Sequence, residues 1–575
     1  MPSTNETVEA LFAEWAELLQ LAGADAFRVR AYEKAARSIG GFSKDLRDLD
    51  DKGLRAIPSV GASMAARIRE YLETGTLHEL EDLREQVPAG LREMMRIPSL
   101  GPKKAILLHE TLGISTVDEL AGAARDGKLR GIKGLGQKTE ENLLRGIQNL
   151  REHGGRILID AAMDAAVGVI EALRGLAEVD QITYAGSLRR MRDTIGDIDI
   201  LVASANAAPI MDSFAGLSSV KEVLAHGETK TSVLTDTGLQ IDLRTVPADA
   251  WGAALIYFTG SKSHNIKIRE IAVRRGWKLS EWGLFKADTG KKIAAETEEE
   301  VYEALGLPWI PPTMREDTGE IEAAFAGTLP TVVERRDIRG DLHSHTNLTD
   351  GLAPLEEMLA AAAAAGYSYY VVTDHAEGLP MTGMDRGKAL AQRKRIATLQ
   401  KKYPKMTILH GSELNIAKDG SVDYDPAFLA GFDLLVASVH SMFRLPRDEQ
   451  TARIIRAMEN PFINVIGHPT GRLIGRREPI DVDFESICNA AVRTGTALEV
   501  NSFPDRMDLR DEHVRWAIER GVTIAIDTDS HAPKHLEHLR FGVATAQRGW
   551  ARKTDVLNAR TLKQLRTFVE KKRPG

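Results

Sequence analysis

The stretch GSLRRMRDTIGDID, residues 186–199, decides how the middle of the chain folds. It runs into G196-D-I-D-I-L-V, where polar and apolar residues alternate, and this period of two predicts a β-strand. Asp197 and Asp199 then point to one face of the strand, whereas the isoleucine between them points into the core. Downstream, Q240-I-D-L-R has the same pattern and places Asp242 between two apolar neighbours.

These three aspartates would repel one another on adjacent strands unless a cation lay between them. Carboxylate oxygens are hard ligands, so the pattern favours magnesium. The alternative is an exposed sheet face with ordinary surface acids, and an isolated D-x-D would favour it. The motifs on either side of the aspartates argue for the metal site.

Four motifs resemble, in order, the signature of family X DNA polymerases, DNA polymerase beta among them: G186-S187 with Arg190, G196-D197-I-D199, Asp242, and Y257-F-T-G-S-K-S-H-N265-I-K-I-R269. The resemblance covers about residues 1–315 and implies a nucleotidyltransferase palm and a thumb. It implies that Asp197 and Asp199 hold two Mg²⁺ or Mn²⁺ ions. Asp242 would contact the catalytic ion and promote deprotonation of the primer 3′-hydroxyl.

The same resemblance assigns the contacts with the incoming nucleotide. It places the triphosphate near one turn, and the sugar, the base and the template minor groove near another. The residues expected at the triphosphate are Gly186, Ser187, Arg190 and Gly196. Those expected at the sugar are Tyr257, Phe258 and Gly260, and those expected at the base and the template minor groove are Asn265 and Arg269.

The first 150 residues have helical periodicity, and one glycine turn occurs three times. The copies are I57-P-S-V-G61, I97-P-S-L-G101-P-K-K and I132-K-G-L-G136-Q-K. Each precedes a helix whose free backbone N–H groups can hold a phosphate, and the pattern resembles the helix-hairpin-helix. A single copy would be read as a simple connection. The candidate DNA-binding residues are Gly61, Gly101, Lys103, Lys104, Gly136 and Lys138.

One position departs from the family. Where its lyase members carry the lysine that forms a Schiff base with an abasic sugar, this chain has Arg67. A guanidinium stays protonated and cannot act as that nucleophile. We therefore expect lyase activity to be absent or weak unless Lys34 or another lysine substitutes.

The Pro-rich segment L307-P-W-I-P-P-T, followed by acidic and Ala-rich sequence to about Arg336, is typical of a connector. Beyond it, apolar runs that predict strands alternate with helical segments, the plainest being LEEMLAAAAAAG after Pro354. Each run ends in a potential metal ligand. This arrangement is how an α/β barrel builds its site, at the C-terminal ends of the strands.

This part of the chain contains nine candidate ligands, six histidines and three acids, which are too many for one ion. Imidazole together with carboxylate suits zinc, manganese or iron. The segments D-L-H-S-H-T…D-G, T-D-H, G-S-E, S-V-H, G-H-P and D-T-D-S-H resemble those of PHP domains over about residues 338–575. The resemblance implies a centre of three ions, Zn²⁺ or Mn²⁺ or both. Nearby Arg506 and Arg510 would either guide a DNA backbone or be solvated surface. The ligand set is His343, His345, Asp350, His375, Glu413, His440, His468, Asp529 and His531.

The predicted architecture is multidomain, α+β and α/β, because 575 residues exceed what one core supports. Its last segment is a distorted (β/α) barrel. The expected segments are an N-terminal helical DNA-binding domain with a helix-hairpin-helix (1–85), a fingers-like helix-hairpin-helix domain (86–150), a nucleotidyltransferase palm (151–250), a nucleotide-binding thumb (251–315), a linker (316–337) and a PHP metal-dependent phosphoesterase domain (338–575).

Composition narrows the class of protein further. Hydrophobic content of 43% with 27% charged residues is typical of a globular protein, and no leader or membrane segment is evident, so we expect a cytoplasmic location. The single cysteine, Cys488, excludes an intramolecular disulfide. A net charge of −7 argues mildly against nucleic acid, but it averages over domains and includes acids that metals would neutralise. Nothing requires more than a monomer.

Together the halves resemble bacterial family X polymerases with a C-terminal PHP domain. The predicted function is DNA-directed synthesis that fills short gaps in DNA repair, with gapped or primer-template DNA and dNTPs as partners. The PHP domain would be a 3′-5′ exonuclease, with 3′-end cleaning or incision at abasic sites as further activities. One alternative is a PHP metallophosphatase for a small phosphomonoester whose front half is a non-catalytic DNA tether. Another is a non-catalytic DNA-binding scaffold.

Overall fold

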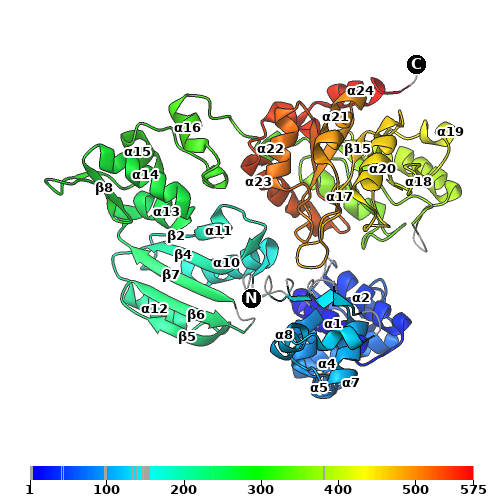
Figure 1. Cartoon of the computed structure of the whole chain (residues 1–575), viewed down its shortest axis with the longest axis horizontal. Helices are drawn as coiled ribbons and strands as arrows, with labels where there is room; N and C mark the ends of the chain where they lie inside the picture. Colours follow the sequence, from blue (N-terminus) through cyan, green and yellow to red (C-terminus); the bar gives the residue numbers. More distant parts are fainter. Residues whose placement is uncertain are drawn as a thin grey trace.

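The computed structural model describes residues 4–573 except 41, 43–44, 96, 98–99, 133–134, 138, 141–142, 145–146, 148–155, 237–238 and 380–382. Figure 1 shows a helical N-terminal domain, a mixed body of sheet and helices, and a C-terminal α/β domain. Among the described residues, no helix combines the length and the apolar character that crossing a membrane requires.

The N-terminal domain is built from short helices around one apolar core, in which Phe12, Trp15 and Tyr32 pack their rings together. Two long helices, α1 and α2, make its most extensive contact. The helices are α1 (Thr4–Leu21), α2 (Ala26–Gly40), α3 (Asp51–Arg55), α4 (Ala62–Thr74), α5 (His78–Gln86), α6 (Ala89–Met95), α7 (Pro102–Leu112) and α8 (Val117–Arg125).

The three glycine turns are built alike. In each, a backbone N–H donates to the isoleucine carbonyl three residues earlier, over 3.1, 3.0 and 3.0 Å at Val60, Leu100 and Leu135. In each, the glycine carbonyl then accepts from the N–H four residues later, at Ala65, Ala105 and Glu140. Gly61 and Gly101 are the N-caps of α4 and α7 without a side-chain cap. Those helix starts are therefore open to an anion.

The palm follows as a five-stranded sheet of order β2-β4-β7-β6-β5. β4 and β7 are parallel neighbours, and their register pairs Asp199 with Asp242. Helices α10 and α12 pack on this sheet (Figure 1). The elements are β1 (Ile157–Leu158), α10 (Ile159–Arg174), β2 (Gln181–Tyr184), α11 (Gly186–Arg189), β3 (Thr194–Ile195), β4 (Asp197–Ala203), α12 (Ala208–Ala215), β5 (Val220–His226), β6 (Lys230–Thr235) and β7 (Gln240–Val246).

The thumb continues directly from β7. Its core joins α13, α14 and α15 to an antiparallel sheet of order β10-β9-β8. A buried ion pair joins Arg315 and Glu298 in this domain, with Nη1 2.8 Å from Oε1. The elements are α13 (Trp251–Thr259), α14 (Lys262–Arg274), β8 (Trp277–Ser280), β9 (Gly283–Lys286), β10 (Lys292–Ala294), α15 (Glu298–Ala304) and α16 (Glu320–Phe325).

The C-terminal domain is a parallel seven-stranded sheet in sequence order, β11 to β17. A parallel bridge between Ser344 and Ser530 links its first and last strands, so the sheet closes into a nearly complete barrel. The expected α/β barrel is confirmed. The strands are β11 (Gly340–Asp341), β12 (Tyr369–Val372), β13 (Thr407–Asn415), β14 (Leu434–Ser438), β15 (Val465–Ile466), β16 (Ala497–Asn501) and β17 (Ile524–Asp527).

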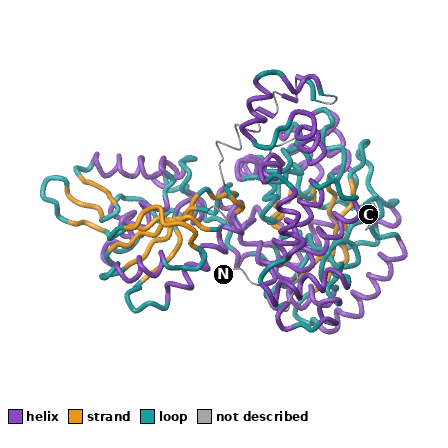
Figure 2. Tube along the Cα trace, turned by 90° about the horizontal axis from the view of Figure 1, so that it is seen from below, coloured by secondary structure: helices purple, strands orange, loops and turns teal. Residues whose placement is uncertain are grey.

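The barrel's helices cover its outside, as Figures 1 and 2 show, because strands buried on both faces need an outer apolar layer. Cys488 is buried on one of them, α21. They are α17 (Leu355–Ala364), α18 (Arg386–Leu399), α19 (Pro426–Leu429), α20 (Arg447–Glu459), α21 (Phe484–Thr494), α22 (Asp511–Glu519), α23 (Leu539–Arg548) and α24 (Leu562–Glu570).

The palm and thumb share their cores with the barrel domain. Met507 and Phe541, both fully buried, belong to the apolar cluster of the palm. Trp550 and Val332 belong to that of the thumb. By contrast, the N-terminal cluster contains only residues up to Ile147 within the described part of the chain.

Candidate polymerase and metal centres

The three palm aspartates lie on adjacent strands. Asp199 and Asp242 are register partners, and Asp197 is two residues before Asp199. Burial, together with repulsion from Asp197 and Asp242, raises the pKa of Asp199 to about 7. Burial also disfavours the charge on Asp242, but hydrogen bonds from Lys230 and Gln240 outweigh it and leave its pKa below the ordinary value. The cluster therefore suits a divalent cation.

Lys230 was not identified from the sequence. Its ammonium lies 2.6 Å from Asp242 Oδ2, because β6 pairs with β7 and places the lysine beside the site. A cation thus already neutralises one member of the cluster. Its position on the neighbouring strand is a tertiary feature, and only the alternation of K230-T-S-V-L-T hinted at a strand.

Gly186 begins the turn that faces the aspartates. Its φ of +59° is in the left-handed region. A Cβ at this position would lie 2.3 Å from Asp199 Oδ2, so any other residue would displace the carboxylate. The residues after it form α11, which leads to Arg190.

Arg190 connects this turn to the start of the thumb. Its Nε donates to Glu316 Oε1 over 2.8 Å, and its Nη1 donates to the carbonyl of Thr259 over 2.5 Å. Gly260, with φ +71°, follows at the end of α13, where a Cβ would lie 3.1 Å from Arg190 Nη1. The turns predicted for the triphosphate and for the sugar are therefore adjacent.

The residues predicted to contact the sugar, the base and the template minor groove lie on the same thumb segment. Asn265 Nδ2 donates to the Tyr257 carbonyl over 2.7 Å, and Arg269 Nε donates to the Asn265 carbonyl over 3.0 Å. The rings of Tyr257 and Phe258 meet edge to face at 5.0 Å. Gly196 lies at the start of β4, on the palm side. Hydrogen bonds thus connect the turn predicted for the triphosphate with the thumb segment, and Gly186 in that turn lies against Asp199.

The predicted DNA-backbone contacts lie in the N-terminal domain. A Cβ built on Gly61, Gly101 or Gly136 meets no atom within 4 Å, so the space before each turn is open. Lys103 is exposed at the start of α7, and Lys104 is half-buried there. Lys138 lies outside the described residues.

The nine predicted metal ligands converge at the C-terminal ends of the barrel strands. Eight of them form three groups whose ligand atoms lie within 4.8 Å of one another. The ninth, His468, places Nε2 3.0 Å from Glu413 Oε1. The groups are His345, Asp350, His375 and His531; His343, His345 and Asp529; and His375, Glu413 and His440.

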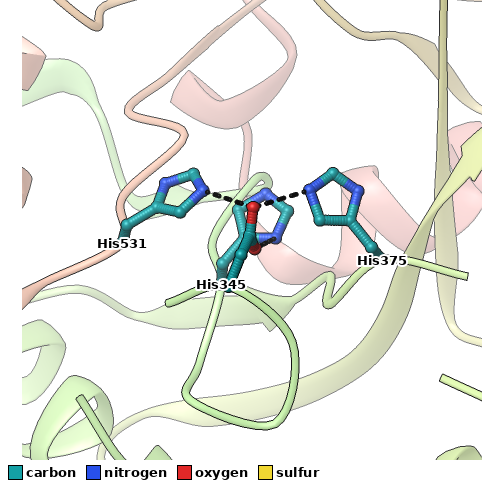
Figure 3. A group of neighbouring side chains, drawn as sticks. His345, His375 and His531 are labelled. Carbon is teal, nitrogen blue, oxygen red and sulfur yellow. Dashed lines mark ion pairs between the residues drawn. The ribbon is translucent and has the colours of Figure 1, made fainter. Parts of the chain in front are cut away.

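Shared ligands link these groups into one centre. Figure 3 shows His375 and His531 flanking His345, with a carboxylate oxygen between them; this is Asp350 Oδ2, 3.3 and 3.4 Å from their Nε2 atoms. Glu413 has His375 Nδ1 at 2.9 Å from one oxygen and His440 Nε2 at 3.1 Å from the other. Glu413 Oε2 also has His343 Nε2, a member of the second group, at 3.4 Å, so this carboxylate links two of the three groups.

The donor atoms fit divalent ions. His343 Nε2 and both ring nitrogens of His345 are buried without a well-directed hydrogen bond, although carboxylate oxygens lie nearby. Burial disfavours the imidazolium of His375, but Glu413 and Asp350 outweigh it and raise its pKa to about 10. Metal ions would replace such protons, and imidazole with carboxylate suits zinc or manganese.

β16 is the one strand for which the sequence suggested no ligand, and it carries the partners that orient the others. Glu499 Oε1 lies 2.7 Å from His343 Nδ1, and its Oε2 accepts the backbone N–H of His468. Asn501 Nδ2 donates to Asp529 Oδ2 over 3.0 Å. An acid inside the apolar run ALEVN was the missed signal.

The two nearby arginines differ. Arg506 Nε lies 3.5 Å from Asp529 Oδ2, so this guanidinium faces the centre. Arg510 is partly exposed and lies 3.7 Å from Glu512. Of the two alternatives left by the sequence, the geometry places Arg506 at the site and Arg510 on the surface.

Models of four domain families match the chain. They are a helix-hairpin-helix domain over residues 3–77, a SAM-like helix-hairpin-helix tandem over 91–149, the DNA polymerase beta thumb over 254–316 and the PHP domain over 341–502. The DNA polymerase/3′-5′ exonuclease PolX of Bacillus subtilis is 36% identical over 556 residues, which cover 96% of this chain and 97% of that protein. A probable phosphatase of Thermoanaerobacter sp. (strain X514) is 29% identical over 246 residues, 40% of this chain and 95% of its own.

The fold and the two centres define a polymerase of the DNA polymerase beta type joined to a PHP domain. With a relative matched over nearly its whole length, the chain belongs to the bacterial family X DNA polymerases that carry a C-terminal PHP domain.

Proposed function

We propose that the protein fills short DNA gaps as a DNA-directed DNA polymerase in repair, and that its PHP domain trims DNA as a metal-dependent 3′-5′ exonuclease. The observation that carries the proposal is the pair of separate centres, three carboxylates on β4 and β7 and nine ligands at the barrel mouth. The proposal keeps the six expected segments, with α16 of the expected linker packed against the thumb core, and it keeps the DNA-backbone contacts given above.

In the polymerase reaction, Asp197, Asp199 and Asp242 hold two Mg²⁺ or Mn²⁺ ions. Bound there, such ions would supply charge stabilisation for the attacking and leaving oxygens of the in-line displacement. Asp242 faces the primer end and favours loss of the 3′-hydroxyl proton. The turn with Ser187 and Arg190 holds the triphosphate.

The thumb segment supplies selectivity in the same proposal. Tyr257, Phe258 and Gly260 pack against the sugar and exclude a 2′-hydroxyl. Asn265 and Arg269 meet the base and the minor groove. These assignments are supported by the single connected network that joins α13, α14 and Arg190.

In the nuclease reaction, the nine PHP ligands hold zinc, manganese or both. Bound there, such ions would supply Lewis-acid polarisation of a phosphodiester and would activate a water near neutral pH. Glu499 and Asn501 orient His343 and Asp529, and Arg506 offers a positive charge to the phosphate. End cleaning or incision at an abasic site would use the same arrangement.

The test follows a 5′-labelled primer on gapped DNA with Mn²⁺, with and without dNTPs. Asp242→Asn is expected to stop extension but not shortening, and His440→Gln to do the reverse. Matched controls are Asp236→Asn, an exposed acid beyond β6, and His513→Gln, a histidine on α22 outside the centre. A parent protein that neither extends nor shortens the primer overturns the proposal.

The match of the barrel to probable phosphatases favours one second candidate, hydrolysis of a small phosphomonoester. This candidate predicts that the parent protein releases phosphate from such a substrate and leaves DNA intact. His440→Gln should abolish the phosphate release. Release that occurs without any shortening of DNA would support this candidate over the exonuclease.

A further inference from the structure

Residues 190–196 connect the triphosphate turn with the aspartate strand, and the PHP domain holds this connection. Asp193 lies at its middle. Its Oδ1 is 2.8 Å from Arg548 Nη2, and its Oδ2 is 2.7 Å from Arg472 Nη2. Both arginines belong to the barrel domain, so one palm carboxylate is paired with two PHP guanidiniums.

Arg548 lies at the end of α23 with only 1% of its side chain exposed. Besides Asp193, it contacts Asp511 Oδ2 at 2.9 Å and donates to the carbonyl of Met191. Met191 has φ +56°, a conformation that a non-glycine residue rarely adopts without support from its surroundings. Arg548 thus fixes both the backbone and the side chain of the connection.

Arg472 continues the path into the PHP centre. It follows the ligand His468 by four residues, and it donates to the carbonyls of Arg506 and Met507 over 2.7 and 2.5 Å. Arg506 in turn faces Asp529. A continuous series of polar contacts therefore joins the PHP ligands to the segment before Asp197.

The charges make this contact strong. Burial disfavours the carboxylate of Asp193, but Arg548 and Arg472 outweigh it and lower its pKa to about 2. A buried charge that loses its partner is costly, so separation of Asp193 from these arginines is disfavoured. The segment it fixes begins directly after Ser187 and Arg190, the residues assigned to the triphosphate.

We infer that Asp193 is a positioning residue of the polymerase reaction and that Arg472 and Arg548 of the PHP domain hold it in place. The PHP domain thereby completes the nucleotide-binding turn of the palm. This inference rests on the proposed polymerase function. It gives the PHP domain a part in synthesis that is independent of its own chemistry.

Steady-state extension by the full-length protein tests the inference. Asp193→Asn keeps the size of the side chain and removes its charge, so the KM for dNTP should rise roughly 2- to 30-fold, the range for residues that couple to a site without touching the ligand. The kcat should change less, because the aspartates on β4 remain. Asp193→Glu keeps the negative charge, so its KM should lie between those of the parent and Asp193→Asn.

Arg472→Gln should also raise the KM, and the double variant should be no worse than Asp193→Asn alone, since the loss of the Asp193 charge already removes the contact with Arg472. The control is Thr313→Val, which removes a 3.0 Å hydrogen bond to Gln547 on the same α23 but does not touch residues 186–199. Thermal unfolding of each variant separates loss of fold from loss of positioning.

The outcomes are distinguishable. A parent protein without extension removes the proposed function and the inference together. A parent that extends while Asp193→Asn and Arg472→Gln keep its KM overturns only the inference. An equal rise of KM in Thr313→Val also overturns it, because the effect would then belong to the interface as a whole.

Discussion

Asp199 and Asp242 are register partners on neighbouring strands, yet their carboxyl groups hold protons differently. Lys230 stabilises the charge of Asp242, whereas Asp199 is buried beside two other acids and has a pKa of about 7. At the scale of the residue, the neighbours across the sheet decide which carboxylate a metal must deprotonate. The sequence places both acids in equivalent strand positions.

Polymerase activity should therefore depend on pH and Mg²⁺ together. Below pH 7, Asp199 without metal is mostly protonated, so Mg²⁺ must displace a proton. Extension at low Mg²⁺ should fall as the pH drops from 8 to 6, and saturating Mg²⁺ should move that fall to lower pH. An acidic limb whose midpoint is independent of Mg²⁺ would contradict this.

Glu499 should matter for metal binding although it was not predicted as a ligand. Glu499→Gln removes the charge that orients His343 through Nδ1, and the metal affinity should fall roughly 10- to 100-fold. Competition with a zinc chelator measures this, and primer extension should persist. Glu512→Gln, an exposed acid on α22, is the control. Equal affinities in the two variants would rule out the role.

The Arg67 side chain, at the position of the lyase lysine, contacts other residues of the N-terminal domain. Its guanidinium lies 2.6 Å from Glu79 and 5.1 Å from the ring of Trp15, and a guanidinium is not the amine nucleophile that a Schiff base requires. Borohydride should therefore trap little abasic DNA on the protein, and Arg67→Lys should trap more. Strong trapping by the parent that Lys34→Ala abolishes would assign the nucleophile to Lys34.

At the scale of elements, repeated local patterns gave repeated structures. The three glycine turns have the same two hydrogen bonds, because the same short sequence forms each turn before a helix. Likewise, six barrel strands end beside the ligands expected there. β16 differs, since its acid and amide serve the neighbouring ligands. That role depends on lateral pairing with β15 and β17, which no local period reveals.

The turn before α7 yields a prediction about DNA affinity. Lys103→Ala removes one exposed positive charge near the N-terminus of α7, so binding should weaken on any sequence. The slope of log K against log salt should become shallower by about 0.9 if one phosphate contact is lost. Glu110→Ala, an exposed acid on the same helix, should not flatten the slope. Unchanged slopes in both would exclude this contact.

At the scale of the whole molecule, the palm and the PHP domain share apolar core residues, so we expect them to unfold together. Phe541 of α23 is fully buried within the palm cluster. Phe541→Ala should lower the free energy of unfolding of the palm and the PHP domain by about 3–5 kcal/mol. In calorimetry it should lower the midpoint temperature of the single transition in which both unfold. The control Phe325→Ala alters a ring that is 53% exposed and should have little effect. Two separate transitions, only one of them shifted, would contradict a shared core.

The sequence by itself determined the strand that presents Asp197 and Asp199, the repeated turns and the ligands at the barrel mouth. Each depends on periodicity or on residues a few positions apart, and backbone geometry converts that spacing into a shared face or a strand end. The two classes of chemistry followed from the same local patterns.

Only the tertiary structure decided how the two halves meet. Asp193 and Arg472 are 279 residues apart, and neither belongs to a pattern that marks it as a partner of the other. Their contact exists because two folded surfaces match in shape and charge, a property of packing that sequence spacing does not encode. The same holds for Phe541 in the palm core and for Lys230 beside Asp242.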